Sequence, residues 1–157
     1  MTRVDFYLLP PGPEGPEGFA CRLAEKAWRQ GLRVHLRAPD AERAQALDRM
    51  LWTYRAGSFV PHALAGELPQ GAEEDRPVLL GGPEEPPPEP WRDLLVNLAG
   101  DVPPWFGAFR RLAEPVPPEG REAARARYRL YRARGCELYA HDLARGQGGA
   151  WRARGGR

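Results

Sequence analysis

The strongest constraint on the fold is the regular alternation of strand and helix patterns along the chain. Residues 4–9 form a mostly apolar run, which is typical of a strand buried on both faces. Residues 19–31 repeat apolar side chains at helical spacing and end at Gly31, a residue type favoured at helix C-termini. A second strand pattern at 32–38 and a second helix pattern at 39–52 follow. This order predicts an α/β fold built on one open, mostly parallel sheet with flanking helices.

The second strand pattern alternates between apolar and polar residues, with His35 among the polar ones. Because successive side chains of a strand point to opposite faces, we expect one buried face and a solvent-facing His35. In the helix pattern that follows, Asp40 stands where an N-cap is expected. The predicted buried face of that helix consists of Ala44, Leu47 and Leu51.

Later segments continue the alternation as far as an arginine-rich helix. Further strands are expected at 76–82, 93–99 and 110–116, and the last of them precedes a final helix over 121–135. We expect no strand after this helix, which leaves His141 close to an unstructured tail.

Length and composition indicate one soluble domain. The chain has 157 residues, of which 42% are hydrophobic and 28% charged, as is typical of globular proteins. We expect a single domain over residues 1–143 and a Gly/Arg-rich tail over 144–157. No apolar run approaches the roughly 20 residues of a membrane span and no signal peptide is recognisable, so we expect a cytoplasmic protein without membrane contact. Cys21 and Cys136 lack zinc-ligand spacing and are expected to be reduced packing residues.

The loop after the first strand is where many α/β folds bind phosphate. Such a loop presents backbone N–H groups to the anion, but residues 10–19 read PPGPEGPEGF. Proline has no N–H to donate, and Glu14 and Glu17 would repel an anion. Neither a G-K-[ST] nor a G-x-G-x-x-G pattern occurs there. We therefore expect a Rossmann-like, three-layer fold without a phosphate-binding loop and without a cofactor.

Patterns for catalysis or metal binding are equally sparse. Ser58 is the only serine, and no G-x-S-x-G motif surrounds it. Residues of the types that bind metals do not cluster at ligand spacing. His62 does have aromatic neighbours, in a segment that also contains Trp52 and Phe59. Two interpretations of this segment stay open, a part of the core and a surface that binds another protein.

The arginine-rich helix is predicted to have a cationic face. At about 100° per residue, an aromatic ring and several guanidinium groups fall within one arc of the helix. This face suits an acidic peptide with an apolar anchor, or single-stranded nucleic acid, and it is also compatible with a merely solvated surface. Its residues include Arg121, Arg125, Tyr128 and Arg129, and the opposite side, expected to pack on the sheet, consists of Ala123, Ala126, Leu130 and Ala133.

Several segments resemble the chi subunit family of bacterial DNA polymerase III. They are FYLLP (6–10), AEKAWRQGLRV (24–34), LDRMLWTYRAGSFVPHALAGE (47–67), RDLLVNLAG (92–100) and RARYRLYRARG (125–135). The resemblance covers the chain up to about residue 143. It implies a non-catalytic accessory subunit of the clamp-loader assembly, with a nucleotide-binding-like fold that has no known nucleotide site.

The resemblance also implies two docking surfaces. The first binds the psi subunit of the clamp loader, or a replacement partner, and a repair helicase competes for it in some species. Its implied residues are Trp52, Phe59, Pro61 and His62. The second binds the acidic C-terminal tail of single-stranded DNA-binding protein, so contact with nucleic acid is mostly indirect. Its implied residues are Val116, which lines the apolar part, and Arg121, Arg125, Tyr128 and Arg129.

Two further hypotheses remain open on the sequence alone. One is a nucleotide- or phosphate-binding enzyme of Rossmann-like fold, which thermal stabilisation by nucleotide would reveal. The other is direct binding of single-stranded DNA through the arginine strip and the tail, which retention of an oligonucleotide at low salt would reveal.

Overall fold

A computed structural model describes residues 1–54, 57, 59–68, 71–84, 86–145 and 150–152 of the chain. Ser58 lies outside the described residues, as do the parts 146–149 and 153–157 of the predicted tail. The helices are α1 (Gly15–Arg29), α2 (Ala41–Thr53) and α3 (Arg121–Ala133). The strands are β1 (Arg3–Leu8), β2 (Val34–Arg37), β3 (His62–Leu64), β4 (Val78–Gly81), β5 (Leu94–Asn97), β6 (Arg111–Val116), β7 (Glu137–Asp142) and β8 (Ala150–Arg152).

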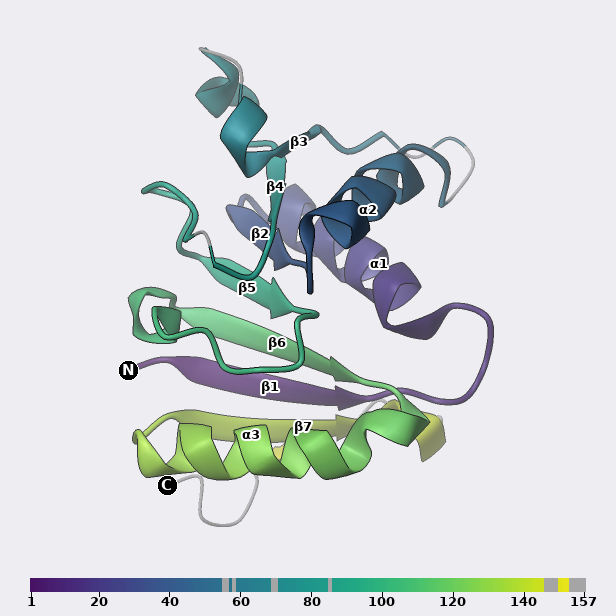
Figure 1. Ribbon diagram of the computed structural model, residues 1–157, viewed down its shortest axis with the longest axis vertical. Helices are drawn as coiled ribbons and strands as arrows, with labels where there is room; N and C mark the ends of the chain where they lie inside the picture. Colours follow the sequence, from purple (N-terminus) through teal and green to yellow (C-terminus); the bar gives the residue numbers. More distant parts are fainter. Residues whose placement is uncertain (55–56, 58, 69–70, 85, 146–149, 153–157) are drawn as a thin grey trace.

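These strands form one open sheet in the order β3-β4-β2-β5-β6-β1-β7-β8 (Figure 1). Every neighbouring pair is parallel except β7 and β8, which are antiparallel. The predicted α/β class with a mostly parallel sheet is therefore confirmed. Strand β8 lies within the segment predicted as a tail and pairs with β7.

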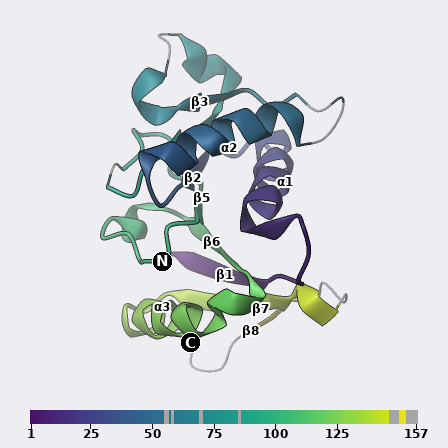
Figure 2. The same cartoon turned by 45° about the vertical axis from the view of Figure 1, so that its right-hand side comes forward.

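The sheet is covered on both faces, which gives the three expected layers (Figures 1 and 2). Side chains that alternate along β5 show this division: Leu94 and Val96 belong to the core with α1 and α2, whereas Leu95 belongs to the core with α3. A central parallel strand must be apolar on both sides, as β5 is, because each side meets a different layer.

Strand β2 differs from its prediction, because neither of its faces is open to solvent. It lies between β4 and β5, and both His35 and Arg37 are buried, with relative exposures of 0% and 1%. Arg37 donates to the carbonyl oxygen of Pro83 and to side-chain oxygens of Asn97 and Asp101. The polar side of β2 is thus an internal polar layer, and the expectation of a solvent-facing His35 is wrong.

The expectation that no strand follows the arginine-rich helix is also wrong. Residues Glu137–Asp142 form β7, which pairs in parallel with β1 and contains His141. Leu138 and Ala140 stand two residues apart and are both buried in β7, and this spacing was the available sequence signal. β6, α3 and β7 form a parallel strand–helix–strand crossover, in which β1 lies between the two strands and pairs with both.

Other local predictions are confirmed. The side chain of Asp40 accepts a hydrogen bond from the Arg43 backbone N–H at 2.7 Å, as an N-cap does. The buried face of α2 contains the expected Ala44, Leu47 and Leu51. Both cysteines are free and buried. In the part of the chain that the structure describes, no helix combines the length and apolar character needed to cross a membrane.

Candidate protein-docking surfaces

The aromatic segment places two large rings on the surface at the end of α2 and in the connection to β3. Trp52 is 59% exposed and Phe59 is 63% exposed, and their ring centroids lie 6.0 Å apart in an edge-on arrangement. Rings this exposed contribute little to the core, so the core interpretation of these two residues is wrong. They form an apolar projection suited to a partner that buries it.

His62 and Pro61 shape the chain beneath these rings. The buried imidazole of His62 packs edge-on to Trp52 at 4.7 Å between centroids, and its Nδ1 lies 2.8 Å from the carbonyl oxygen of Val60. Its Nε2 lies 3.5 Å from the carboxylate of Asp48 on α2. Pro61 accepts a hydrogen bond from the Val78 N–H at 2.8 Å, next to the pairing of β3 with β4. Trp52, Phe59, Pro61 and His62 are called the aromatic surface below.

Two arginines and the tyrosine of the cationic face of α3 line one side of a small cavity beside the sheet. Its volume is about 190 Å³, and α3 covers one side of it with Arg121, Ala124, Arg125 and Tyr128. Phe6 and Leu8 of β1 and Ala140 of β7 form the apolar floor. The Phe6 and Tyr128 rings lie 5.6 Å apart between centroids. Three of the five predicted tail-binding residues thus meet around one apolar hollow, which is called the basic pocket below.

The other two predicted residues lie elsewhere. Val116 is fully buried in the core with α3, with 0% exposure, and is not among the described residues that line the basic pocket. The apolar floor is instead supplied by Phe6, Leu8 and Ala140, which sequence reasoning did not select. Arg129 is exposed one turn beyond Arg125, outside the described lining.

The inner face of α3 was predicted incorrectly. All four residues expected to pack on the sheet are exposed, and the buried residues of the helix are Ala124, Arg127 and Tyr131. An acidic residue on β6, Glu114, lies beneath this face and pairs with the arginine. The residues wrongly predicted as buried are Ala123, Ala126, Leu130 and Ala133.

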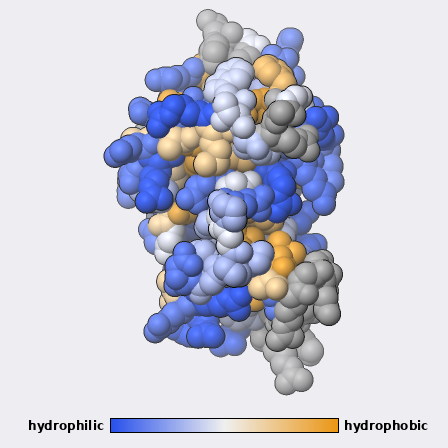
Figure 3. All heavy atoms as spheres, turned by 90° about the vertical axis from the view of Figure 1, so that its right-hand side faces the viewer, coloured by the Kyte–Doolittle hydropathy of each residue, from blue (hydrophilic) through white to orange (hydrophobic). Residues whose placement is uncertain are grey.

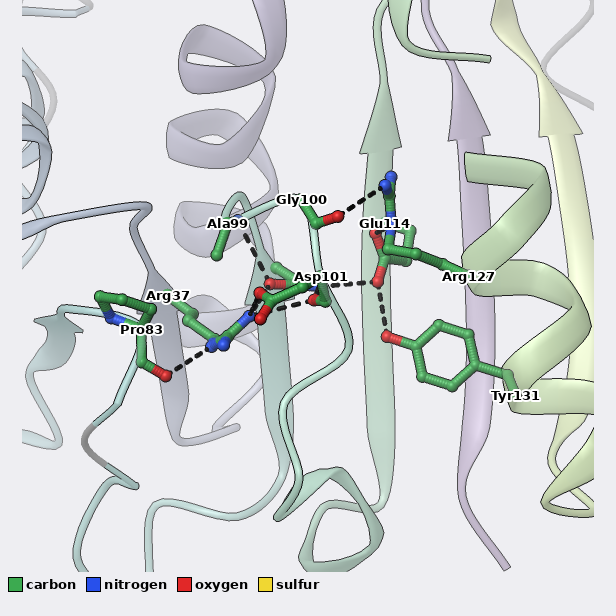
Figure 4. A network of polar contacts seen from close by, with 9 residues as sticks. Arg37, Pro83, Ala99, Gly100, Asp101, Glu114, Arg127 and Tyr131 are labelled. Carbon is green, nitrogen blue, oxygen red and sulfur yellow. Dashed lines mark hydrogen bonds and ion pairs between the residues drawn. The ribbon is translucent and has the colours of Figure 1, made fainter. Parts of the chain in front are cut away.

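Glu114 is the centre of a buried polar network (Figure 4). Its carboxylate accepts hydrogen bonds from Arg127 Nε at 2.9 Å, from Asn97 Nδ2 at 2.8 Å and from the Tyr131 hydroxyl at 2.5 Å. Asn97 in turn accepts from Arg37, so the network extends from α3 across β6 and β5 to β2. Burial raises the pKa of Glu114, and these three donors act in the opposite direction.

A larger cavity of about 580 Å³ opens at the carboxyl ends of β5 and β6, where doubly wound sheets often bind ligands. Figure 3 looks onto this end of the strands, which is mostly hydrophilic with smaller hydrophobic patches. The cavity is lined largely by apolar groups, and its cationic side chains already have carboxylate partners: Arg43 lies 3.8 Å from Glu17, and Arg127 binds Glu114. This pairing gives the nucleotide hypothesis no support.

The described part of the chain also shows no candidate metal-binding site. No group of three or more His, Cys, Asp or Glu side chains there is arranged to hold a metal ion. The buried Cys21 has a pKa raised to about 12 by burial, which keeps the thiol protonated and unreactive.

Comparisons with known proteins identify the family to which the chain belongs. Residues 1–139 match the family described as DNA polymerase III chi subunit, HolC. The chain is 45% identical to DNA polymerase III subunit chi of Pseudomonas aeruginosa, over 92% of this chain and 99% of that protein. It is 36% identical to the subunit chi of Escherichia coli, over 88% and 96% of the two chains, and 32% identical to that of Haemophilus influenzae, over 81% and 87%. The chain therefore belongs to the DNA polymerase III chi subunit family, whose members are accessory subunits of the replicative polymerase.

Proposed function

We propose that this chain is a non-catalytic adaptor that links the clamp-loader assembly to the acidic C-terminal tail of single-stranded DNA-binding protein. The basic pocket is the observation that carries the proposal. Arg121 and Arg125 supply guanidinium groups, which bind carboxylates through charge-assisted hydrogen bonds. The apolar floor and the Tyr128 ring accept an apolar anchor at the end of the tail. Polymerase activity then lies in another chain, and the adaptor works in the cytoplasm.

The aromatic surface provides the second attachment, to the psi subunit or to a partner that replaces it. Trp52 lies at the end of α2, and β3 is the outermost strand on that side of the sheet. The basic pocket lies beside β1 and β7, towards the opposite edge (Figure 1). Because the two surfaces are separate, the adaptor can hold both partners together. A repair helicase that uses the aromatic surface would compete with psi and leave tail binding intact.

The decisive experiment is a titration of a fluorescently labelled acidic peptide ending in Pro-Phe, followed by anisotropy. We expect micromolar binding by the wild-type chain and at least a tenfold loss in Arg125→Ala, since a charge-assisted hydrogen bond contributes about 1.5–3 kcal/mol. Arg49→Ala is the matched control, because Arg49 is an exposed arginine on α2. No binding by the folded wild-type chain at low salt would refute the proposal.

A parallel titration with a labelled single-stranded oligonucleotide separates indirect from direct contact with DNA. We expect weak binding that disappears at moderate salt, because exposed arginines attract any polyanion. Salt-resistant oligonucleotide binding that Tyr128→Ala abolishes would favour direct DNA binding through base stacking instead.

A further inference from the structure

The arginine-rich helix has one arginine that is directed into the protein. Arg127 donates from Nε to the Glu114 carboxylate and from Nη1 to the carbonyl oxygen of Gly100, at 2.9 and 3.1 Å. Tyr131, one turn further along α3, donates to the same carboxylate (Figure 4). Glu114 is fully buried, and the Arg127 side chain is 10% exposed. α3 is therefore attached to the sheet through a buried charged contact.

The rotation of α3 about its axis that allows this contact differs from the rotation that the apolar pattern of the helix alone would favour. The apolar stripe formed by Ala123, Ala126, Leu130 and Ala133 faces solvent, and Leu130 is among the most exposed large hydrophobic residues described. At about 100° per residue, that stripe lies roughly a third of a turn away from the buried face. Rotating α3 by this amount would bury the stripe, but it would withdraw Arg127 from Glu114. An unpaired carboxylate in the core is strongly unfavourable, so the pair opposes this rotation.

The rotation of α3 also decides which side chains reach the basic pocket. Arg121 and Tyr128 lie beside the buried face, close enough to the sheet to line the cavity over β1 and β7. A rotation by a third of a turn would direct Tyr128 outward, away from the Phe6 ring on β1. The three lining residues from the cationic face therefore depend on the rotation that Arg127 and Glu114 favour.

We propose that Arg127 and Glu114 are positioning residues for the basic pocket: their buried pair fixes the rotation of α3 about its axis and thereby holds Arg121, Arg125 and Tyr128 around the cavity. The functional part of this inference rests on the proposed binding of the acidic tail. The structural part, the rotation of the helix, can be measured without any partner.

The first measurement uses a cysteine introduced at an exposed position of the stripe. In a Leu130→Cys background, the new thiol is expected to react readily with a thiol reagent, whereas Cys21 and Cys136 are buried. Adding Glu114→Gln keeps the shape of the side chain but removes the charge that pairs with Arg127. We expect labelling of the introduced thiol to slow at least threefold, because the stripe turns towards the sheet. Adding Arg127→Gln as well restores a neutral hydrogen-bonded pair, and fast labelling should return.

The second measurement titrates the same acidic peptide, ending in Pro-Phe, against the variants with Leu130 intact. Glu114→Gln is expected to weaken binding at least fivefold, and the Glu114→Gln/Arg127→Gln pair should recover most of it. Leu80→Ala controls for stability alone, because it removes a buried side chain from the core with α1 and α2. Both labelling and affinity should stay unchanged in folded Leu80→Ala protein.

The outcomes separate the two parts of the inference. Unchanged labelling in folded Glu114→Gln protein overturns the claim about helix rotation. Slower labelling with unchanged peptide affinity overturns the positioning role. Slower labelling in a protein whose wild type binds no peptide supports the rotation and refutes the proposed function. If Glu114→Gln does not fold, Arg127→Gln breaks the same pair from the helix side, and slower labelling and weaker peptide binding are then expected; the absence of any shift would overturn the inference.

Discussion

The imidazole of His141 on β7 lies with its Nε2 atom 2.8 Å from Oδ1 of Asp5 on β1. Asp5 is buried and also accepts hydrogen bonds from Arg3 and Arg111. Burial by itself would raise the pKa of Asp5, but the bonds from Arg3 and His141 and the charge of Arg111 together lower it. A carboxylate buried at the centre of the pairing of β1 with β6 and β7 is thus kept ionised by cationic neighbours.

Asp5→Asn should lower the free energy of unfolding by about 1–3 kcal/mol at pH 7, because several donors lose a charged acceptor. Since the pKa of Asp5 is lower in the folded state, its stabilising effect is present above the unfolded pKa and is lost as the pH falls through the folded one. Urea unfolding at pH 7 and pH 3 measures this, and the two proteins should converge in acid. Exposed Glu42→Gln is the control, and an Asp5→Asn effect equal to it would contradict the prediction.

His35 should make the protein sensitive to mild acid. Burial, together with the charges of Arg37 and Arg92, lowers its pKa from the ordinary 6.5 to about 3. Below pH 6.5 the His35 imidazole therefore binds a proton in the unfolded chain but not in the folded chain. The free energy of unfolding consequently falls as the pH decreases towards 3.

The slope due to this histidine amounts to at most about 1.4 kcal/mol per pH unit. His35→Leu should remove that slope and raise stability at pH 7, because both ring nitrogens are buried without a hydrogen-bond partner among the described residues. Unfolding free energies of the two proteins between pH 7 and pH 4.5 provide the comparison. Parallel curves would mean that His35 is not the titrating group.

Trp52→Ala and Phe59→Ala should weaken docking to the clamp-loader partner without destabilising the domain. Both rings are mostly exposed, so little core packing is lost, whereas an aromatic ring at an interface commonly contributes about 2 kcal/mol or more, roughly thirtyfold in affinity. Thermal unfolding and a pull-down or calorimetric titration with psi test this. Leu130→Ala is matched as an exposed large apolar residue on another helix and should leave docking unchanged. The idea fails if both aromatic variants bind psi normally.

Arg129→Ala should affect binding of the acidic peptide less than Arg125→Ala does. Arg125 lines the basic pocket and Arg129 is exposed outside its described lining, so Arg129 acts mainly through its screened charge. We expect a loss of about two- to threefold for Arg129→Ala at physiological salt, decreasing further at higher salt. Equal, salt-independent losses in the two variants would instead place both arginines in direct contact with the peptide.

Patterns that depend on near neighbours in the chain could be predicted from the sequence. The N-cap at Asp40 and the buried face of α2 follow from hydrogen bonding and periodicity within one helix. The expectation that the first loop does not bind phosphate rests on the covalent structure of proline, which lacks a backbone N–H. Arg121, Arg125 and Tyr128 could be placed on one face because helical spacing alone brings them together.

The sequence by itself therefore determined the α/β class, most of the elements and the residues of the cationic face. Only the tertiary structure decided that β2 is covered on both faces, that β7 completes the parallel sheet and that α3 turns Arg127 inward. Periodicity reports which residues share a side of an element, but not what covers that side. For α3, the buried carboxylate of Glu114 on β6 determines which side of the helix faces the sheet. A charge in the core requires a partner, and no pattern within the helix reveals that requirement.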